Sequence, residues 1–192
     1  MAIGAVVGGL IGAFAAYYGG KTDSILMRII DIMMSIPSMV LAIAICAALG
    51  PGLVNTMIAV GFSSVPTYAR VVRSAVLSIR QQEYIEAAGA IGAKNWRIIR
   101  KHIIPNSLAP IIVQASLGVG NAIQSAASMS FLGLGIQPPT PEWGAMLSAG
   151  RQFLRDYPMM VVTPGICIVL VISSLNMLGD GLRDALDPRM KR

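Results

Sequence analysis

Long apolar stretches separated by short charged segments constrain the fold of this chain more than any other feature. A helix needs about 20 apolar residues to cross a hydrocarbon core of ~30 Å. Five stretches meet or approach that length, at residues 2–18, 32–49, 53–72, 107–130 and 159–178. Each is continuous rather than alternating, which argues against membrane strands. The sequence therefore predicts one all-α membrane domain over residues 1–192, with about five transmembrane helices.

The composition agrees with a membrane protein. Of the 192 residues, 55% are hydrophobic and only 12% are charged, and the mean hydropathy is +0.68. Soluble domains carry roughly 25% charged residues. The net charge of +6 would suit nucleic acid, but the cations lie between the apolar stretches, where membrane topology explains them. We therefore expect lipid, and no nucleic acid, as a partner.

The positions of the cations predict the orientation. If the loop at residues 80–105 is cytoplasmic, 13 of the 15 cations lie inside and only Arg151 and Arg155 lie outside. Cytoplasmic loops of membrane proteins are enriched in Lys and Arg. We thus expect a multi-pass protein of the cytoplasmic (inner) membrane, with this loop and the C-terminus inside. The chain begins within apolar sequence and without a leader, so a preceding helix is expected to be missing.

Several local patterns were weighed for chemistry. The first span carries Gly4, Gly8, Gly12 and Ala16 on one face, which suits either a subunit interface or packing within the chain. Residues 15–22 nearly match a phosphate-binding loop, but the preceding segment is a membrane span and not a strand. A tight turn is the preferred interpretation there.

No arrangement typical of catalysis or metal binding appears. His102 is the only histidine, which excludes a histidine-based metal cluster or catalytic pair. Cys46 and Cys167 lie in apolar runs, where packing is expected. Arg28 and Asp31 are three residues apart and could form a structural ion pair on one helix face. We expect no catalytic residue, no metal and no cofactor.

The acidic residues near the C-terminus have a structural interpretation. Asp180, Asp184 and Asp187 are the only acidic cluster, and their spacing suits the capped start of a short tail helix.

The loop at residues 80–105 has the most distinctive pattern. We expect two short helices, at residues 81–91 and 94–103, with a bend at Gly92 and with Pro105 preventing continuation into the next span. The apolar faces are expected at Tyr84, Ala88 and Ile91, and at Trp96, Ile99 and Ile103. A basic, bent, amphipathic loop can lie on anionic lipid or insert into a groove on a partner. The small residues at 86–92 favour the groove.

The loop resembles the EAA loop of binding-protein-dependent ABC importer permeases. That pattern reads Glu-Ala-Ala, three residues, Gly, nine residues, Ile, any residue, Leu-Pro. Here Glu86-Ala87-Ala88, Gly92 and Pro105 match, while His102 replaces Ile and Ile104 replaces Leu. Further segments at 28–31, 131–135, 137–144 and 179–188 are similar to the C-type permeases of the dipeptide/oligopeptide/nickel branch, whose members have an additional N-terminal span.

The resemblance implies a function and a set of partners. The chain would be a permease that passes di- or oligopeptides, or a related cargo such as nickel chelates, by alternating access, with ATP hydrolysed by a separate subunit. Partners would be a second permease, two ATP-binding subunits and a periplasmic or lipid-anchored substrate-binding protein. Residues of the loop would couple to the ATPase: Glu86, Ala87, Ala88, Gly89, Gly92, Ile104 and Pro105.

Two alternative functions are open: the chain could instead be a membrane-embedded enzyme or a self-sufficient secondary carrier.

The external loop at residues 133–158 is expected to contain a short amphipathic helix at the outer interface. Such a helix suits an outer gate or a docking surface for the binding protein.

Overall fold

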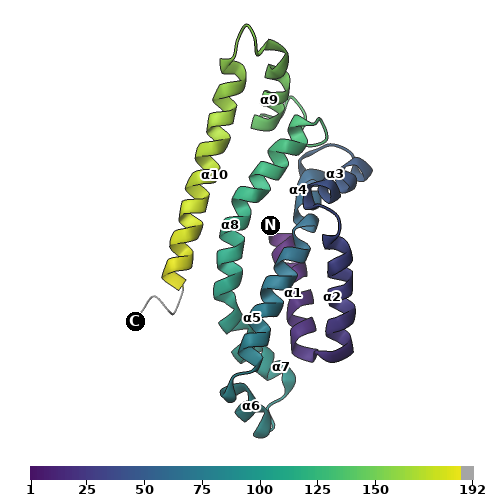
Figure 1. Cartoon of the computed structure of the whole chain (residues 1–192), viewed down its shortest axis with the longest axis vertical. Coiled ribbons are helices and arrows are strands. Elements are labelled where there is room, and N and C mark those ends of the chain that lie inside the picture. Colours follow the sequence, from purple (N-terminus) through teal and green to yellow (C-terminus); the bar gives the residue numbers. More distant parts are fainter. Residues whose placement is uncertain (187–192) are drawn as a thin grey trace. The chain divides into compact units, whose positions relative to one another are not determined.

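The computed structural model describes residues 1–186, and within them the chain is helical with no strand (Figure 1). The all-α prediction is therefore confirmed. Ten α-helices, one π-helical turn and one 3-10 turn follow in this order: α1 (Ala2–Tyr18), α2 (Gly20–Met34), α3 (Ser38–Leu49), α4 (Leu53–Ser63), α5 (Val65–Arg80), α6 (Glu83–Ala90), α7 (Asn95–Ile98), the π-turn (Ile99–Ile103), α8 (Ile104–Phe131), α9 (Trp143–Gly150), the 3-10 turn (Arg151–Phe153) and α10 (Met159–Leu186).

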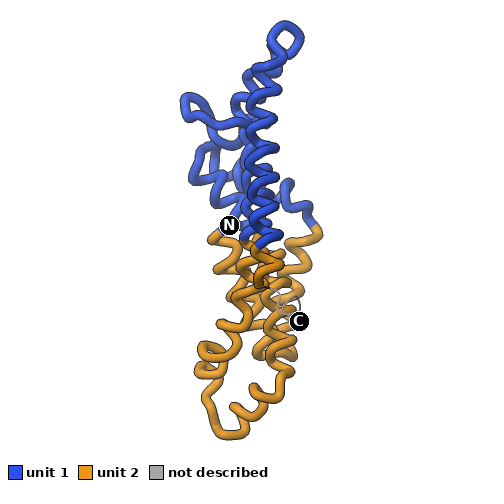
Figure 2. Tube along the Cα trace, turned by 90° about the vertical axis from the view of Figure 1, so that its left-hand side faces the viewer, with its two compact units in different colours: residues 1, 36–63, 116–181 blue, residues 2–35, 64–115, 182–192 orange. Residues whose placement is uncertain are grey.

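The helices form two compact units (Figure 2). Unit 1 comprises Met1 and residues 36–63 and 116–181, and unit 2 comprises residues 2–35, 64–115 and 182–192. Unit 2 contains α1, α2, α5 and the whole loop at residues 80–105, so the candidate site lies within one unit.

In unit 2, α1 packs closely along α5 because its contact face carries small residues. A Cβ on Gly8 would collide with the carbonyl oxygen of Val65, and one on Gly12 would collide with that of Ala69. Gly4 and Ala16, on the same face, are also buried. Small residues let backbones approach where lipid supplies no hydrophobic drive. For this stripe, packing within the chain is the correct interpretation at Gly8 and Gly12.

Unit 1 has its own small core around α3, α4 and α8. Cys46, Ala59 and Met129 are buried together, and the Cys46 thiol donates to the carbonyl oxygen of Leu134 at 3.1 Å. The expected packing role of Cys46 is confirmed. In the segment at residues 133–158, α9 is the expected short helix, and the Glu142 carboxylate caps it by accepting from the Ala145 N–H at 2.7 Å.

Fewer helices than expected are long enough to span a membrane. By length and composition two qualify, Asn95–Phe131 and Met159–Leu186, and a third exists if α2 and α3, bent by 84°, form one broken span. The helix at 2–18 is present but has only 17 residues. The five predicted spans therefore stay a prediction.

Prolines explain where the structure departs from the predicted spans. The stretch at 32–49 is not one helix, because Pro37 lacks an N–H and disfavours helical geometry in the preceding residue, so α3 starts only at Ser38. The stretch at 53–72 is divided between α4 and α5, with Pro66 in the first turn of α5, where a missing N–H is tolerated.

The acidic residues near the C-terminus do not start a separate tail helix. Asp180 and Asp184 lie inside α10, which continues to Leu186, so this expectation was wrong for both. Asp187 lies outside the described residues.

Candidate functional site

The loop at residues 80–105 turns a sharp corner at Gly92. The φ angle of Gly92 is +78°, which favours glycine. The Gly92 N–H donates to the carbonyl of Gly89 at 3.0 Å, and the Ala93 N–H donates to that of Ala88 at 3.1 Å. These two bonds form a Schellman motif, which closes the C-terminus of α6. The predicted bend between two helices at Gly92 is confirmed.

Three isoleucines anchor the loop to the rest of unit 2. Ile85 on α6, Ile98 on α7 and Ile103 in the π-turn are buried in one cluster with Val72 and Val76 of α5. Figure 1 shows α6 and α7 at the end of α5. Burying a side chain of this size contributes about 1.5–3 kcal/mol. The corner is thus held by apolar packing on its inner side.

The outer side of the corner is exposed and partly apolar. Ile91 is 85% exposed and Trp96 is 66% exposed. Glu86, Ala87 and Gly89 are exposed as well, and Ala88 is half-buried against the isoleucine cluster. A Cβ on Gly89 would meet nothing within 4 Å. The packing of the chain itself therefore does not require a small residue at this position.

The residues of the predicted apolar faces are divided in the structure. Ile103 is buried, and Ala88 and Ile99 pack against the isoleucine cluster. Tyr84, Ile91 and Trp96 are exposed, while Ile85 and Ile98, outside the predicted faces, are buried. A helix of two turns has apolar residues on both sides here, so periodicity could not indicate which side meets α5.

The second half of the loop continues directly into α8. The expectation that Pro105 would prevent the helix from continuing into the next span was therefore wrong. The residues 95–131 form one helical stretch. The π-turn absorbs the proline: the Ile104 N–H bonds to the Ile99 carbonyl, five residues back. A π-bulge of this kind accommodates a residue without an N–H inside a helix.

The two ends of the loop are tied by polar side chains. Asn106 donates through Nδ2 to the His102 carbonyl at 2.6 Å and to the Tyr84 hydroxyl at 3.4 Å. The ring centroids of Tyr84 and His102 are 6.0 Å apart. The His102 ring thus lies beside the Tyr84 ring within the loop. Ile104 and Pro105, both exposed, lie at this end, away from the corner that Gly92 forms.

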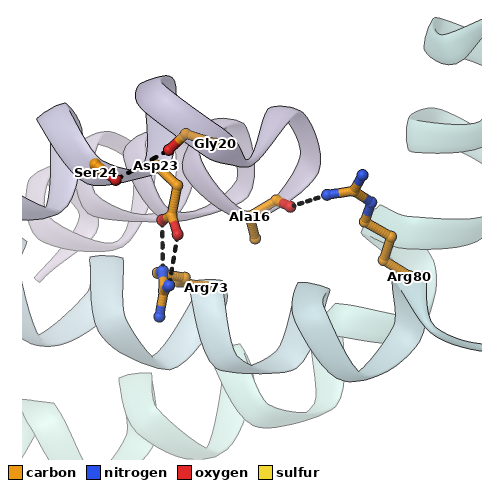
Figure 3. Close-up of polar contacts among 6 residues, drawn as sticks. All are labelled: Ala16, Gly20, Asp23, Ser24, Arg73 and Arg80. Carbon is orange, nitrogen blue, oxygen red and sulfur yellow. Dashed lines mark hydrogen bonds and ion pairs between the residues drawn. The ribbon is translucent and has the colours of Figure 1, made fainter.

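Ion pairs connect α2 to α5. Arg73 binds both carboxylate oxygens of Asp23, each at 2.6 Å (Figure 3). Arg70 binds Asp31 at 2.7 Å. The expected pair of Arg28 with Asp31 was wrong, because among the described residues the ion-pair partner of Asp31 is Arg70. Sequence spacing shows only neighbours on one helix, whereas this partner lies 39 positions away.

The near-match to a phosphate-binding loop lies on a helix–turn–helix. Gly19 and Gly20 have positive φ angles and connect α1 to α2. No strand precedes this turn in the described part of the chain, so it is the tight turn that the sequence suggested. Within residues 1–186 there is also no cluster of His, Cys, Asp or Glu suited to a metal ion.

The chain is similar to known transport proteins. The sequence model of the family described as "Binding-protein-dependent transport system inner membrane component" matches residues 8–192. The dipeptide transport system permease protein DppC of Alkalihalophilus pseudofirmus is 57% identical over 186 residues, which are 97% of this chain and 61% of that protein. The glutathione transport system permease protein GsiD of Pectobacterium atrosepticum is 46% identical over 189 residues, 98% of this chain and 63% of its own length.

A solved structure with the same fold completes the comparison. A chain of the inward-facing MetNI methionine ABC transporter superposes with a TM-score of 0.75 at 22% identity, covering 96% of this chain and 88% of the other. At this identity the likeness concerns the fold. The chain spans about three-fifths of the length of the permeases that it matches.

Proposed function

Because the chain belongs to the family of binding-protein-dependent transport system inner membrane components, we propose that it is a permease subunit of an ATP-driven importer. The observation that carries the proposal is the corner at Gly92. A rigid bend, anchored on its inner side by three isoleucines, presents small and apolar residues outward. Such a shape suits insertion into a groove on another protein.

We infer that the partner at this corner is an ATP-binding subunit. Residues Glu86 to Gly89 and Gly92 would form the contact, and Ile91 would supply exposed apolar area. Because α7 continues through the π-turn into α8 without a break, a displacement of the corner would pass directly to a long apolar helix. The Ile104–Pro105 segment lies on this route rather than at the contact.

The proposed assembly has the parts that such importers require. It contains a second permease, two ATP-binding subunits and a substrate-binding protein outside the membrane. The asymmetry of 13 cations to 2 supports a cytoplasmic position for the loop and the C-terminus. ATP hydrolysis belongs to the ATP-binding subunits, so this chain is not itself an enzyme.

The proposed cargo is a dipeptide, an oligopeptide or a related molecule. Support comes from the similar proteins, which are described as dipeptide, D,D-dipeptide and glutathione permeases.

A bulky residue at the corner tests the coupling role. The Gly89→Leu variant adds a side chain where this chain leaves open space, so folding and membrane insertion are expected to be normal. The Gly181→Leu variant is the matched control, since a Cβ on that helical glycine in α10 also meets nothing within 4 Å. ATP-dependent uptake of a labelled dipeptide is measured in proteoliposomes that contain the full chain and its partners.

We expect Gly89→Leu to lower uptake at least tenfold and to reduce co-purification of the ATP-binding subunit, while Gly181→Leu leaves both unchanged. Uptake by Gly89→Leu at the level of the unaltered chain would refute the coupling role of the corner. Uptake by the chain alone, without ATP-binding subunits, would favour a self-sufficient carrier instead.

A further inference from the structure

A long apolar groove lies within unit 2, between α1 and the helical stretch that starts at Asn95. Its volume is about 440 Å³, within the ~300–1,000 Å³ typical of ligand sites. One wall carries Val6, Leu10, Phe14 and Tyr18, spaced four residues apart on α1, and the other includes Trp96 and Ile104. All six side chains are between 44% and 66% exposed. We call this feature the α1–α8 groove.

The two ends of the α1–α8 groove differ in chemistry. Toward the start of α1 the lining is aliphatic. At the end near the loop it is aromatic, because Tyr17, Tyr18 and Trp96 lie there. Aromatic residues of this kind gather at the membrane–water interface, where their rings contact both the hydrocarbon and the headgroups.

Cations lie at the aromatic end. The Arg80 guanidinium donates to the carbonyl oxygen of Ala16 at 3.1 Å and so lies at the end of α1 (Figure 3). Among the described residues no carboxylate lies within ion-pair distance of Arg80. Arg100 is exposed and lies one helical turn after Trp96. The groove thus runs from aliphatic through aromatic to cationic, in the order of the acyl chain, glycerol region and phosphate of a phospholipid.

The length of the groove suits one acyl chain. From Val6 to Tyr18 the groove follows twelve residues of α1, about 18 Å at ~1.5 Å per residue. One leaflet of hydrocarbon is half of the ~30 Å core.

We propose that the α1–α8 groove binds one acyl chain of an anionic phospholipid, whose phosphate contacts Arg80. Because Trp96, Ile99 and Ile103 in the groove wall belong to the second half of the loop, the bound lipid would brace the loop against α1. This inference concerns lipid binding and does not depend on the transport role.

Tryptophan fluorescence tests the proposal directly. The chain has two tryptophans, so the Trp143→Phe variant leaves Trp96 in the groove wall as the only one. The purified full chain in detergent micelles is titrated with brominated phosphatidylglycerol or brominated phosphatidylcholine, and quenching is recorded. One cation near the headgroup gives about a fivefold binding preference for an anionic lipid over a zwitterionic one. We therefore expect half-quenching at a phosphatidylglycerol fraction at least fivefold lower than for phosphatidylcholine.

Two variants and a control make the result specific. Arg80→Gln is expected to reduce the preference about fivefold, while Arg155→Gln, which removes a cation from unit 1, leaves it unchanged. Gly9→Leu should weaken quenching by both lipids, because its side chain would enter the groove while its Cβ makes only an ordinary contact, 3.8 Å from Val72 Cγ2.

Equal quenching by the two lipids, or an unchanged preference in Arg80→Gln, would overturn the proposal. So would unchanged quenching in a Gly9→Leu variant that elutes as a single species with the helical content of the parent. Loss of quenching once the partner permease is bound would show instead that a partner helix covers the groove.

Discussion

The contact between α1 and α5 gives the sharpest test of how unit 2 is held together. Replacing Gly12 by alanine adds one methyl group at a place with no room for it. The new Cβ would collide with the Ala69 carbonyl oxygen and would lie 3.0 Å from both Ala69 C and Arg73 N. These are backbone atoms, so no side-chain rotation relieves the contact and the helices must separate. Overpacking of this kind costs about 1–3 kcal/mol.

A neighbouring glycine supplies the control. The Cβ of Gly9→Ala would meet only Val72 Cγ2, at 3.8 Å, which is an ordinary contact. Alanine is also a better helix former than glycine by up to ~1 kcal/mol. Gly9→Ala is therefore expected to be neutral or slightly stabilising, although it makes the same chemical change three residues away on the same helix.

Thermal unfolding of the purified chain in detergent distinguishes the two variants. For a chain of this size 1 kcal/mol shifts the Tm by about 2–4 °C, so Gly12→Ala should lower it by about 2–12 °C. All scans use one heating rate, because irreversible unfolding makes the apparent Tm depend on that rate. If Gly12→Ala and Gly9→Ala unfold at the same temperature, the close contact of α1 with α5 does not hold unit 2 together.

Two further predictions concern the ion pair and the loop anchor. Replacing Asp23 by asparagine should destabilise the chain by about 1–3 kcal/mol, because its bidentate partner Arg73 is only 33% exposed. Asp31→Asn should cost at most ~1 kcal/mol, because both side chains of that ion pair are about half exposed. Thermal unfolding measures both variants, and equal effects would contradict this ranking. Ile98→Ala should weaken the packing of the loop against α5 by at least ~2 kcal/mol and so speed trypsin cleavage within the loop about thirtyfold. Ile91→Ala, at an 85% exposed position, should leave the cleavage rate unchanged. Unchanged cleavage of Ile98→Ala would show that the loop is anchored elsewhere.

Local features of the candidate site could be predicted from the residues themselves. The bend at Gly92 follows from the rule that a positive φ favours glycine, and the helices on either side follow from composition and capping. Faces were harder. In α6 both Tyr84 and Ile85 are apolar neighbours, and only contact with α5 decides that Ile85 is buried. The expectation for Pro105 was wrong because a π-turn directly precedes it, and no local sequence pattern indicated that turn.

The sequence by itself determined that this is an all-α membrane protein, and it predicted the side of the membrane on which the loop lies. The length of an apolar stretch and the position of the cations decide whether a segment prefers lipid or water. Both can be read along the chain without knowing any contact between residues. The tertiary structure decided which partners meet. Asp31 pairs with Arg70 rather than with Arg28, and Gly12 meets the Ala69 carbonyl. These contacts join residues 39 and 57 positions apart in the sequence. Such pairs depend on how α1 and α2 pack against α5, and no local pattern contains that information.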